Sequence, residues 1–171
     1  MEVSGTGVTL MDYRPGGLGK VVEMQGNYYG TEWGFGVAFE ADVATDLAAF
    51  LTHFDPSQGG FWLAWFEGEI VGSLTIDGQG ETENRAHLRW FIVDPQIVGR
   101  GVGAQLMDAA MAFCRGCGYD AVWLTTFAGL DAARKLYDRH GFVETGTFKN
   151  DTWDRPVTMQ TLECDLRAEV N

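Results

Sequence analysis

Hydrophobic residues recur along the chain at two spacings, one typical of strands and one typical of helices. Runs of apolar and β-branched residues predict strands at 8–13, 61–66, 70–76, 85–93, 121–126, 142–149 and 157–166. Helix-like spacing covers 18–30, 37–54, 101–117 and 130–140. This order predicts an α/β (α+β) fold in which a mixed sheet carries helices on its faces.

The helix predicted after Gly101 has the clearest apolar stripe. Val102, Leu106, Ala109, Phe113 and Cys117 are spaced four, three, four and four residues apart, which predicts one buried face. The three cysteines of the chain, Cys114, Cys117 and Cys164, have no second C-x-x-C pair or clustered histidines beside them. They are therefore interpreted as core thiols, and no metal site is expected.

Length and composition predict a single domain over residues 1–171. With 46% hydrophobic and 21% charged residues, the chain has enough apolar surface for a full core. No apolar run is long enough to span a membrane and the first residues do not resemble a signal peptide, so we expect a cytoplasmic location without membrane association.

The charge is strongly acidic and unevenly distributed. The formal net charge of −12 disfavours binding to nucleic acid or anionic lipid. Residues 1–84 hold two basic residues against thirteen acidic ones, whereas residues 85–171 hold ten against eleven. The sequence thus predicts two chemically different faces, of which the acidic one favours a cationic partner.

A glycine-rich turn between the predicted strand 85–93 and the helix that follows is the best candidate for chemistry. Glycines at 99, 101 and 103 allow a tight turn and a close backbone approach, and the helix N-terminus attracts an anion such as a pyrophosphate. A turn without a ligand remains an alternative. The same residues match G-x-G-x-x-A of dinucleotide-binding folds, but a hairpin precedes them and no acid ends the next strand.

Two segments together resemble the GNAT superfamily of N-acetyltransferases. The first runs from Val93 through Pro95, Val98 and Gly99 to Gly103, and the second is the run Ala132–Phe142, about 30 residues later. The chain is most similar to the acetyltransferase module of bacterial MarR–GNAT proteins, without their helix-turn-helix domain. The resemblance implies the GNAT fold, with a mostly antiparallel sheet that splays at its central strands.

The resemblance also implies a site for acetyl-CoA, used as a cosubstrate. Tyr137 matches the tyrosine that protonates the departing thiolate. Residues of the strand would pair with the pantetheine arm and main-chain amides of the turn would hold the pyrophosphate. The implied cofactor-binding residues are Ile92, Val93, Val98, Gly99, Arg100, Gly101, Val102, Gly103 and Ala104.

The implied reaction is direct attack of a primary amine of a small molecule or peptide on the thioester, with a backbone N–H near Val93 facing the oxyanion. His87 is the first candidate for the base, ahead of Glu83, Glu81 and Glu32. Packing alone is the alternative role for Tyr137, and an exposed strand histidine is the alternative for His87.

Two positions depart from the family pattern. Val98 replaces the usual Gln or Arg, and Phe127 stands where an Asn often precedes the tyrosine helix. The alternative function is therefore a catalytically silent GNAT module that binds an acyl-CoA or a small molecule. The sequence also leaves open whether the chain forms a homodimer.

Overall fold

A single seven-stranded sheet organises the chain in the computed structural model, which describes residues 7–80 and 83–167. The strand order is β1-β2-β3-β4-β5-β7-β6, and within these described residues only β4 and β5 pair in parallel. The strands are β1 (Thr9–Met11), β2 (Gly60–Phe66), β3 (Glu69–Asp77), β4 (Arg85–Val93), β5 (Ala121–Phe127), β6 (Val143–Asn150) and β7 (Val157–Asp165).

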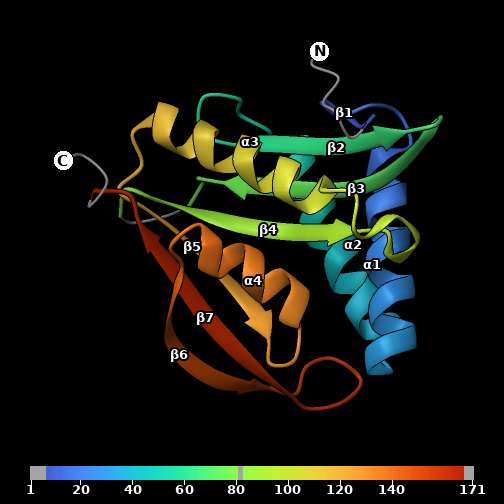
Figure 1. The fold of residues 1–171 in the computed structure, drawn as a ribbon. Helices are drawn as coiled ribbons and strands as arrows, with labels where there is room; N and C mark the ends of the chain where they lie inside the picture. The colour runs from blue at the N-terminus through green and yellow to red at the C-terminus, as the bar shows by residue number, and fades with distance from the viewer. Residues whose placement is uncertain (1–6, 81–82, 168–171) are drawn as a thin grey trace.

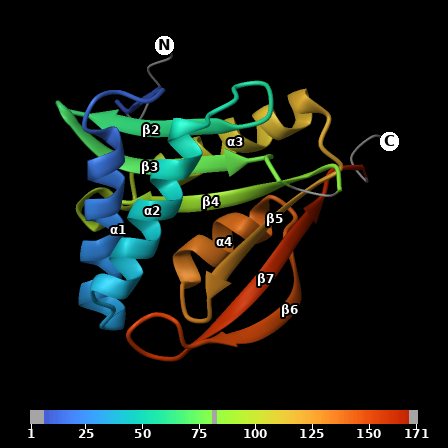
Figure 2. The same ribbon diagram turned by 180° about the vertical axis from the view of Figure 1, so that it is seen from behind.

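Four α-helices cover the two faces of the sheet. Helices α1 (Gly17–Trp33) and α2 (Val37–Thr52) lie on one face, and α3 (Val102–Cys117) and α4 (Asp131–Arg139) lie on the other (Figures 1 and 2). A short 3₁₀ helix, η1 (Pro95–Ile97), follows β4. The predicted element order is confirmed, and the predicted ends differ from the observed ones by a few residues.

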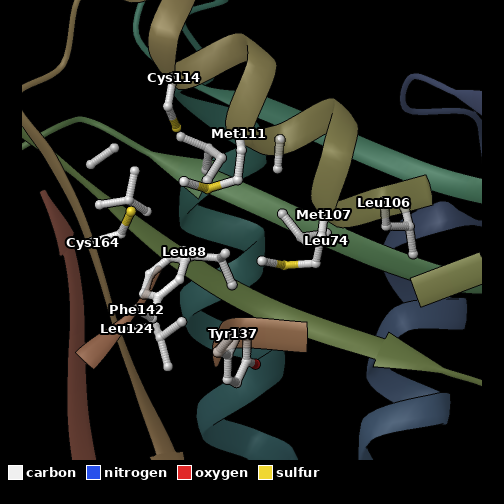
Figure 3. Close-up of a cluster of buried hydrophobic side chains, with 14 of the residues drawn as sticks. Leu74, Leu88, Leu106, Met107, Met111, Cys114, Leu124, Tyr137, Phe142 and Cys164 are labelled. Atoms are coloured by element: carbon white, nitrogen blue, oxygen red, sulfur yellow. The ribbon is translucent and has the colours of Figure 1, made fainter. Parts of the chain in front are cut away.

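The largest core cluster lies between α3 and the sheet. Its side chains include Leu106, Met107 and Met111 of α3, which pack over Leu74 and Leu88 (Figure 3). The predicted stripe on α3 is wrong at Cys117, which is exposed, and the buried thiol is Cys114, whereas Phe113 is partly buried and packs against this cluster. The interpretation of all three cysteines as core thiols is therefore wrong for Cys117. Met107, Ala110 and Met111 are buried on this helix beside Val102 and Leu106, so its buried face is wider than the predicted stripe and is turned relative to it.

The sheet opens between its two parallel strands. β4 and β5 pair only at Arg85 with Ala121, Ala86 with Val122, and His87 with Trp123. Beyond His87, residues 88–93 of β4 have no register with β5. The predicted splay at the central strands is therefore confirmed.

A β-bulge marks the place where β4 changes course. Ser73 pairs with Ile92 and Thr75 pairs with Arg89, so two residues of β4, Trp90 and Phe91, oppose one residue of β3. Trp90 has a φ of 49°, an uncommon conformation for a non-glycine residue, and its carbonyl accepts a hydrogen bond from the Ser73 hydroxyl at 2.9 Å. Because a bulge bends its own strand and increases the local twist, this feature helps turn β4 away from β5.

Candidate active site

The glycine-rich turn forms a left-handed entry into α3. Gly99 and Gly101 have φ values of 97° and 79°, in the region that favours glycine. The first hydrogen bond of the helix runs from the Gln105 amide to the Gly101 carbonyl at 3.0 Å. The amides of Val102, Gly103 and Ala104 precede that donor, so the helix itself offers them no carbonyl. The first turn of α3 holds no acidic residue, so no carboxylate of that turn repels an anion that approaches these amides.

Gly103 is small for a different reason, which is close packing. A Cβ at this position would lie 2.9 Å from Cδ1 of Leu136 and 3.4 Å from Cζ of Phe91. The start of α3 is thus pressed against α4 and β4, beside the opening in the sheet. Of the other turn residues, Val98 is 64% exposed, and the guanidinium of Arg100 lies 5.0 Å from the centre of the Phe66 ring.

The end of β4 presents backbone groups to the opening. The Asp94 amide donates to the Val71 carbonyl at 2.8 Å, so the backbone groups of Asp94 face β3. Peptide groups alternate in direction along a strand. The N–H of Val93 therefore faces the β5 side, where no strand pairs with it, whereas the N–H of Ile92 faces β3. Of the two predicted strand residues, Val93 has the amide that a ligand in the opening can reach.

A cavity of about 230 Å³ lies at this opening and is lined from both faces of the sheet. Phe91, Ala133 and Tyr137 line it on the α4 side, and Tyr29 and Phe39 line it on the α1 and α2 side. The polar lining residues are Gln25, Asp42, Asp46, His87, Arg89, Thr125 and Thr126. Because β4 and β5 have separated, one cavity reaches residues that a continuous sheet would keep apart.

Tyr137 lies on α4, and its ring packs in the main core cluster (Figure 3). The same residue also lines the cavity. It is 5% exposed and contacts Phe91 and Phe142, with ring centres 6.1 and 5.8 Å away. Burial raises the pKa of the Tyr137 phenol above its ordinary value of 10. The hydroxyl therefore stays protonated at neutral pH and can donate a proton or a hydrogen bond.

His87 lies at the last paired position between β4 and β5, on the cavity wall. Its imidazole stacks on the indole of Trp123, with ring centres 3.7 Å apart and an interplanar angle of 8°. Burial, followed by repulsion from Arg89 and Arg85, lowers the pKa of His87 to about 3. The ring is consequently neutral at pH 7, with a lone pair available but with weak basicity.

Comparison with known proteins identifies the family. The sequence model of the acetyltransferase (GNAT) family matches residues 23–142 of this chain. The matched range includes β4, α3 and α4. The chain belongs to the GNAT family of acetyltransferases.

Sequence relatives in curated proteins share about a third of the aligned residues. The zebrafish (Danio rerio) N-acetylaspartate synthetase is 32% identical over 115 residues, which cover 67% of this chain and 39% of that protein. An L-amino acid N-acetyltransferase of Escherichia coli is 36% identical over 90 residues, which cover 51% of this chain and 55% of that protein. The match therefore spans about two fifths of the first of these relatives and about half of the second.

Solved structures show the same GNAT fold. A GNAT-family acetyltransferase from Staphylococcus aureus superposes with a TM-score of 0.73 at 19% identity, covering 93% of this chain and 99% of that one. An acetyltransferase from Salmonella typhimurium, solved with its cofactor acetyl-CoA, superposes with a TM-score of 0.71 at 14% identity, covering 93% and 94% of the two chains.

Other groups named from the sequence lie away from this GNAT cavity. Neither Glu83 nor Glu32 is among its lining residues, and Glu81 lies outside the described residues. Across residues 7–80 and 83–167, no three His, Cys, Asp or Glu side chains cluster in a way that could hold a metal ion, and no helix is long and apolar enough to cross a membrane.

The side of the cavity next to α1 and α2 contains residues that the sequence patterns did not reveal. Arg89 lies 3.5 Å from a carboxylate oxygen of Asp46 and 3.5 Å from one of Asp77, with its guanidinium 4.1 Å from the Trp90 ring centre. The indole N–H of Trp153, in the loop between β6 and β7, donates to Asp42 at 2.7 Å. The four-residue spacing of Asp42 and Asp46 on a helix was the one available signal, because it places both carboxylates on one face.

Proposed function

We propose that this chain is an acetyl-CoA-dependent N-acetyltransferase that acetylates a primary amine by direct attack in a ternary complex. One juxtaposition supports the proposal most. Gly103 at the start of α3 packs against Phe91 of β4 and Leu136 of α4, and the Val93 N–H faces the side from which β5 has separated. Phe91 and Tyr137 line the cavity at that separation, whereas none of residues 92–104 is among its lining residues. GNAT family membership supplies the reaction class.

The residues at the opening fit the chemistry of acetyl-CoA. A diphosphate needs clustered N–H donors without a nearby carboxylate, and the first turn of α3 offers both conditions. Asp94, the acid that precedes the turn, caps η1, because its carboxylate accepts the Gln96 amide at 2.9 Å. In this proposal the main chain from Val98 to Ala104 holds the diphosphate.

Bound acetyl-CoA would supply an activated thioester carbonyl. The Val93 N–H would donate to the carbonyl oxygen as negative charge develops there, and it would do so from a fixed strand that needs no reorganisation. The Tyr137 hydroxyl would donate its proton to the departing sulfur. His87 is the first candidate to accept the proton of the attacking amine, since it lines the same cavity, although its lowered pKa limits its strength as a base.

Several finer expectations belong to the same proposal. The acceptor is a small-molecule or peptide amine, and the acidic N-terminal half favours a cationic one. The names of the relatives point to amino acids as one class of acceptor. A cytoplasmic location and the resemblance to the acetyltransferase module of MarR–GNAT proteins stay predictions, as does a homodimer.

Two measurements test the proposal. Calorimetry with acetyl-CoA should detect binding, and a thiol-release assay across a panel of amines should detect turnover of at least one. Gly101→Val should abolish or weaken binding, because a β-branched residue cannot easily adopt the left-handed φ of 79°. Gly116→Val, near the exposed end of the same helix where a Cβ meets no atom within 4 Å, is the matched control.

The outcomes separate enzyme from binding module. Binding together with thiol release supports the transferase. Binding without thiol release from any amine would favour the catalytically silent module. Failure to bind acetyl-CoA at all would refute the transferase and would leave only a module that binds another acyl-CoA or a small molecule.

A further inference from the structure

The cavity is small, and its wall combines aromatic rings with polar side chains. Its volume of about 230 Å³ is below the range of about 300–1,000 Å³ that holds drug-sized ligands. Aromatic rings from three separate parts of the chain line its α1 and α2 side, namely Tyr29, Phe39 and Trp153. Phe127, which departs from the family pattern, adds a fourth ring and is 7% exposed. A ligand here would gain by burying an apolar body.

The charges beside these rings are net negative. Arg89 is the one basic side chain that lines the cavity among the described residues, and it already faces both Asp46 and Asp77. Asp42 is the second carboxylate that lines the cavity, since Asp77 is not a lining residue, and it accepts a hydrogen bond from the uncharged Trp153 indole. His87 contributes no charge at pH 7 because burial lowers its pKa. Two lining carboxylates against one guanidinium would repel a carboxylate on the ligand and attract an ammonium group.

Gln25 adds a polar contact inside this apolar wall. The residue lies on α1, lines the cavity and is only 4% exposed. Its side chain makes no hydrogen bond to any residue of 7–80 or 83–167, and its amide atoms are not among the fully buried polar atoms that lack a partner in that part of the chain. The carboxamide oxygen can therefore be reached from the cavity and can accept a hydrogen bond from a ligand N–H.

We propose that the acceptor is a primary amine with an aromatic or branched apolar body and no carboxylate, held by Gln25 and by the carboxylates of Asp42 and Asp46. This inference rests on the proposed acetyl transfer and specifies its substrate class. It sets the chain apart from a relative named for making N-acetylaspartate, a product with acidic groups.

Two matched acceptors test whether the site discriminates against a carboxylate on the substrate. Phenethylamine and L-phenylalanine share an aromatic body and differ by one carboxylate, and L-aspartate represents an acidic acceptor. Each is assayed by thiol release at saturating acetyl-CoA, on the full chain. We expect kcat/KM to be about tenfold or more higher for phenethylamine than for phenylalanine, with aspartate lowest. An equal or reversed ratio would overturn the proposal.

A charge substitution tests whether the acids of α2 cause that ratio. Asp46→Asn removes one carboxylate next to Arg89 and should lower the ratio about threefold, by improving the relative use of phenylalanine. Glu40→Gln makes the same charge change on α2 at a residue outside the cavity lining, next to Gly26 of α1, and should leave the ratio unchanged. Equal effects of the two substitutions would assign the ratio to general charge and contradict the proposal.

The contact with Gln25 is tested by a near-isosteric side chain. Gln25→Met keeps the shape and removes the hydrogen-bonding groups, so the KM for phenethylamine should rise about tenfold while the Kd for acetyl-CoA stays the same. An unchanged KM would remove Gln25 from acceptor binding. If this variant does not fold, the ratio measured for Asp46→Asn still decides the proposal.

The assays give different results if the proposed substrate class is wrong and if the proposed transferase function is wrong. If phenylalanine or aspartate is the better acceptor, the transferase function stands and the substrate class is wrong. If no amine releases thiol although acetyl-CoA binds, both are refuted.

Discussion

Lowering the pH should destabilise this protein through His87, and the size of the effect follows from its surroundings. Burial against Trp123 and the nearby charges of Arg89 and Arg85 lower the pKa of His87 to about 3, from an ordinary value of 6.5. Because the folded pKa is depressed, the unfolded chain binds a proton that the folded chain refuses between pH 6.5 and 3. His87 therefore costs no stability above pH 6.5 and costs more as the pH falls through that window.

The magnitude is large enough to measure. At pH 4.5 the solution is about two units below the unfolded pKa and still above the folded one, and each unit corresponds to about 1.4 kcal/mol. The contribution of His87 to the loss between pH 7 and pH 4.5 is therefore about 3 kcal/mol. A domain of this kind has a total stability of roughly 5–15 kcal/mol, so the loss is a substantial part of it.

The assay compares urea unfolding at pH 7 and pH 4.5 for the wild type and for His87→Gln. Carboxylates also titrate in this range, but both proteins share them, so the difference between the two pH-dependent losses isolates His87. We expect the loss to be about 3 kcal/mol smaller in the variant. His53→Gln, which removes an exposed histidine at the end of α2, is the control and should leave the wild-type loss unchanged.

One result would refute the reasoning. If the wild type and His87→Gln lose the same stability between pH 7 and pH 4.5, the pKa of His87 is not depressed in the folded protein. His87 would then titrate near neutrality and would be a stronger base than its environment indicates.

Three further predictions concern the site. Tyr137→Phe should lower kcat by about 10²-fold or more and leave the Kd for acetyl-CoA nearly unchanged, since only the proton donor is lost; unchanged turnover in the thiol-release assay would remove Tyr137 from the acid role. Gly101→Val should raise the Kd for acetyl-CoA at least about tenfold by calorimetry, because its φ of 79° costs a β-branched residue about 1–2 kcal/mol or more; affinity equal to that of Gly116→Val would exclude the turn as the diphosphate site. Trp153→Phe keeps a ring against Phe39 but loses the hydrogen bond to Asp42, so the KM for the acceptor should rise several-fold without a change in acetyl-CoA binding; an unchanged KM would show that this bond does not shape the acceptor side.

The parts of the site that lie within one short segment could be predicted from the sequence. The turn at Gly99 and Gly101 and the start of α3 follow from residues a few positions apart. The required φ strongly favours glycine, and the apolar spacing of a helix begins directly after the turn. Tyr137 was found because a family motif surrounds it. The sequence predicts that Gly103 lets the backbone approach a ligand, and the close packing of Gly103 against Leu136 of α4 could not be predicted because the two residues are far apart in the chain.

The sequence by itself determined the order of the elements, the turn before α3 and the acidic bias of the N-terminal half, since each depends on residues that are neighbours along the chain. Only the tertiary structure decided which face of α3 is buried, where β4 leaves β5 and that Gln25, Asp42, Arg89 and Trp153 meet around one cavity. Those four residues come from α1, α2, β4 and the loop between β6 and β7, so no local spacing relates them. Their meeting depends on strand register, on the bulge at Trp90 and on the packing of two helices against the sheet, which are set by contacts between residues far apart in the chain.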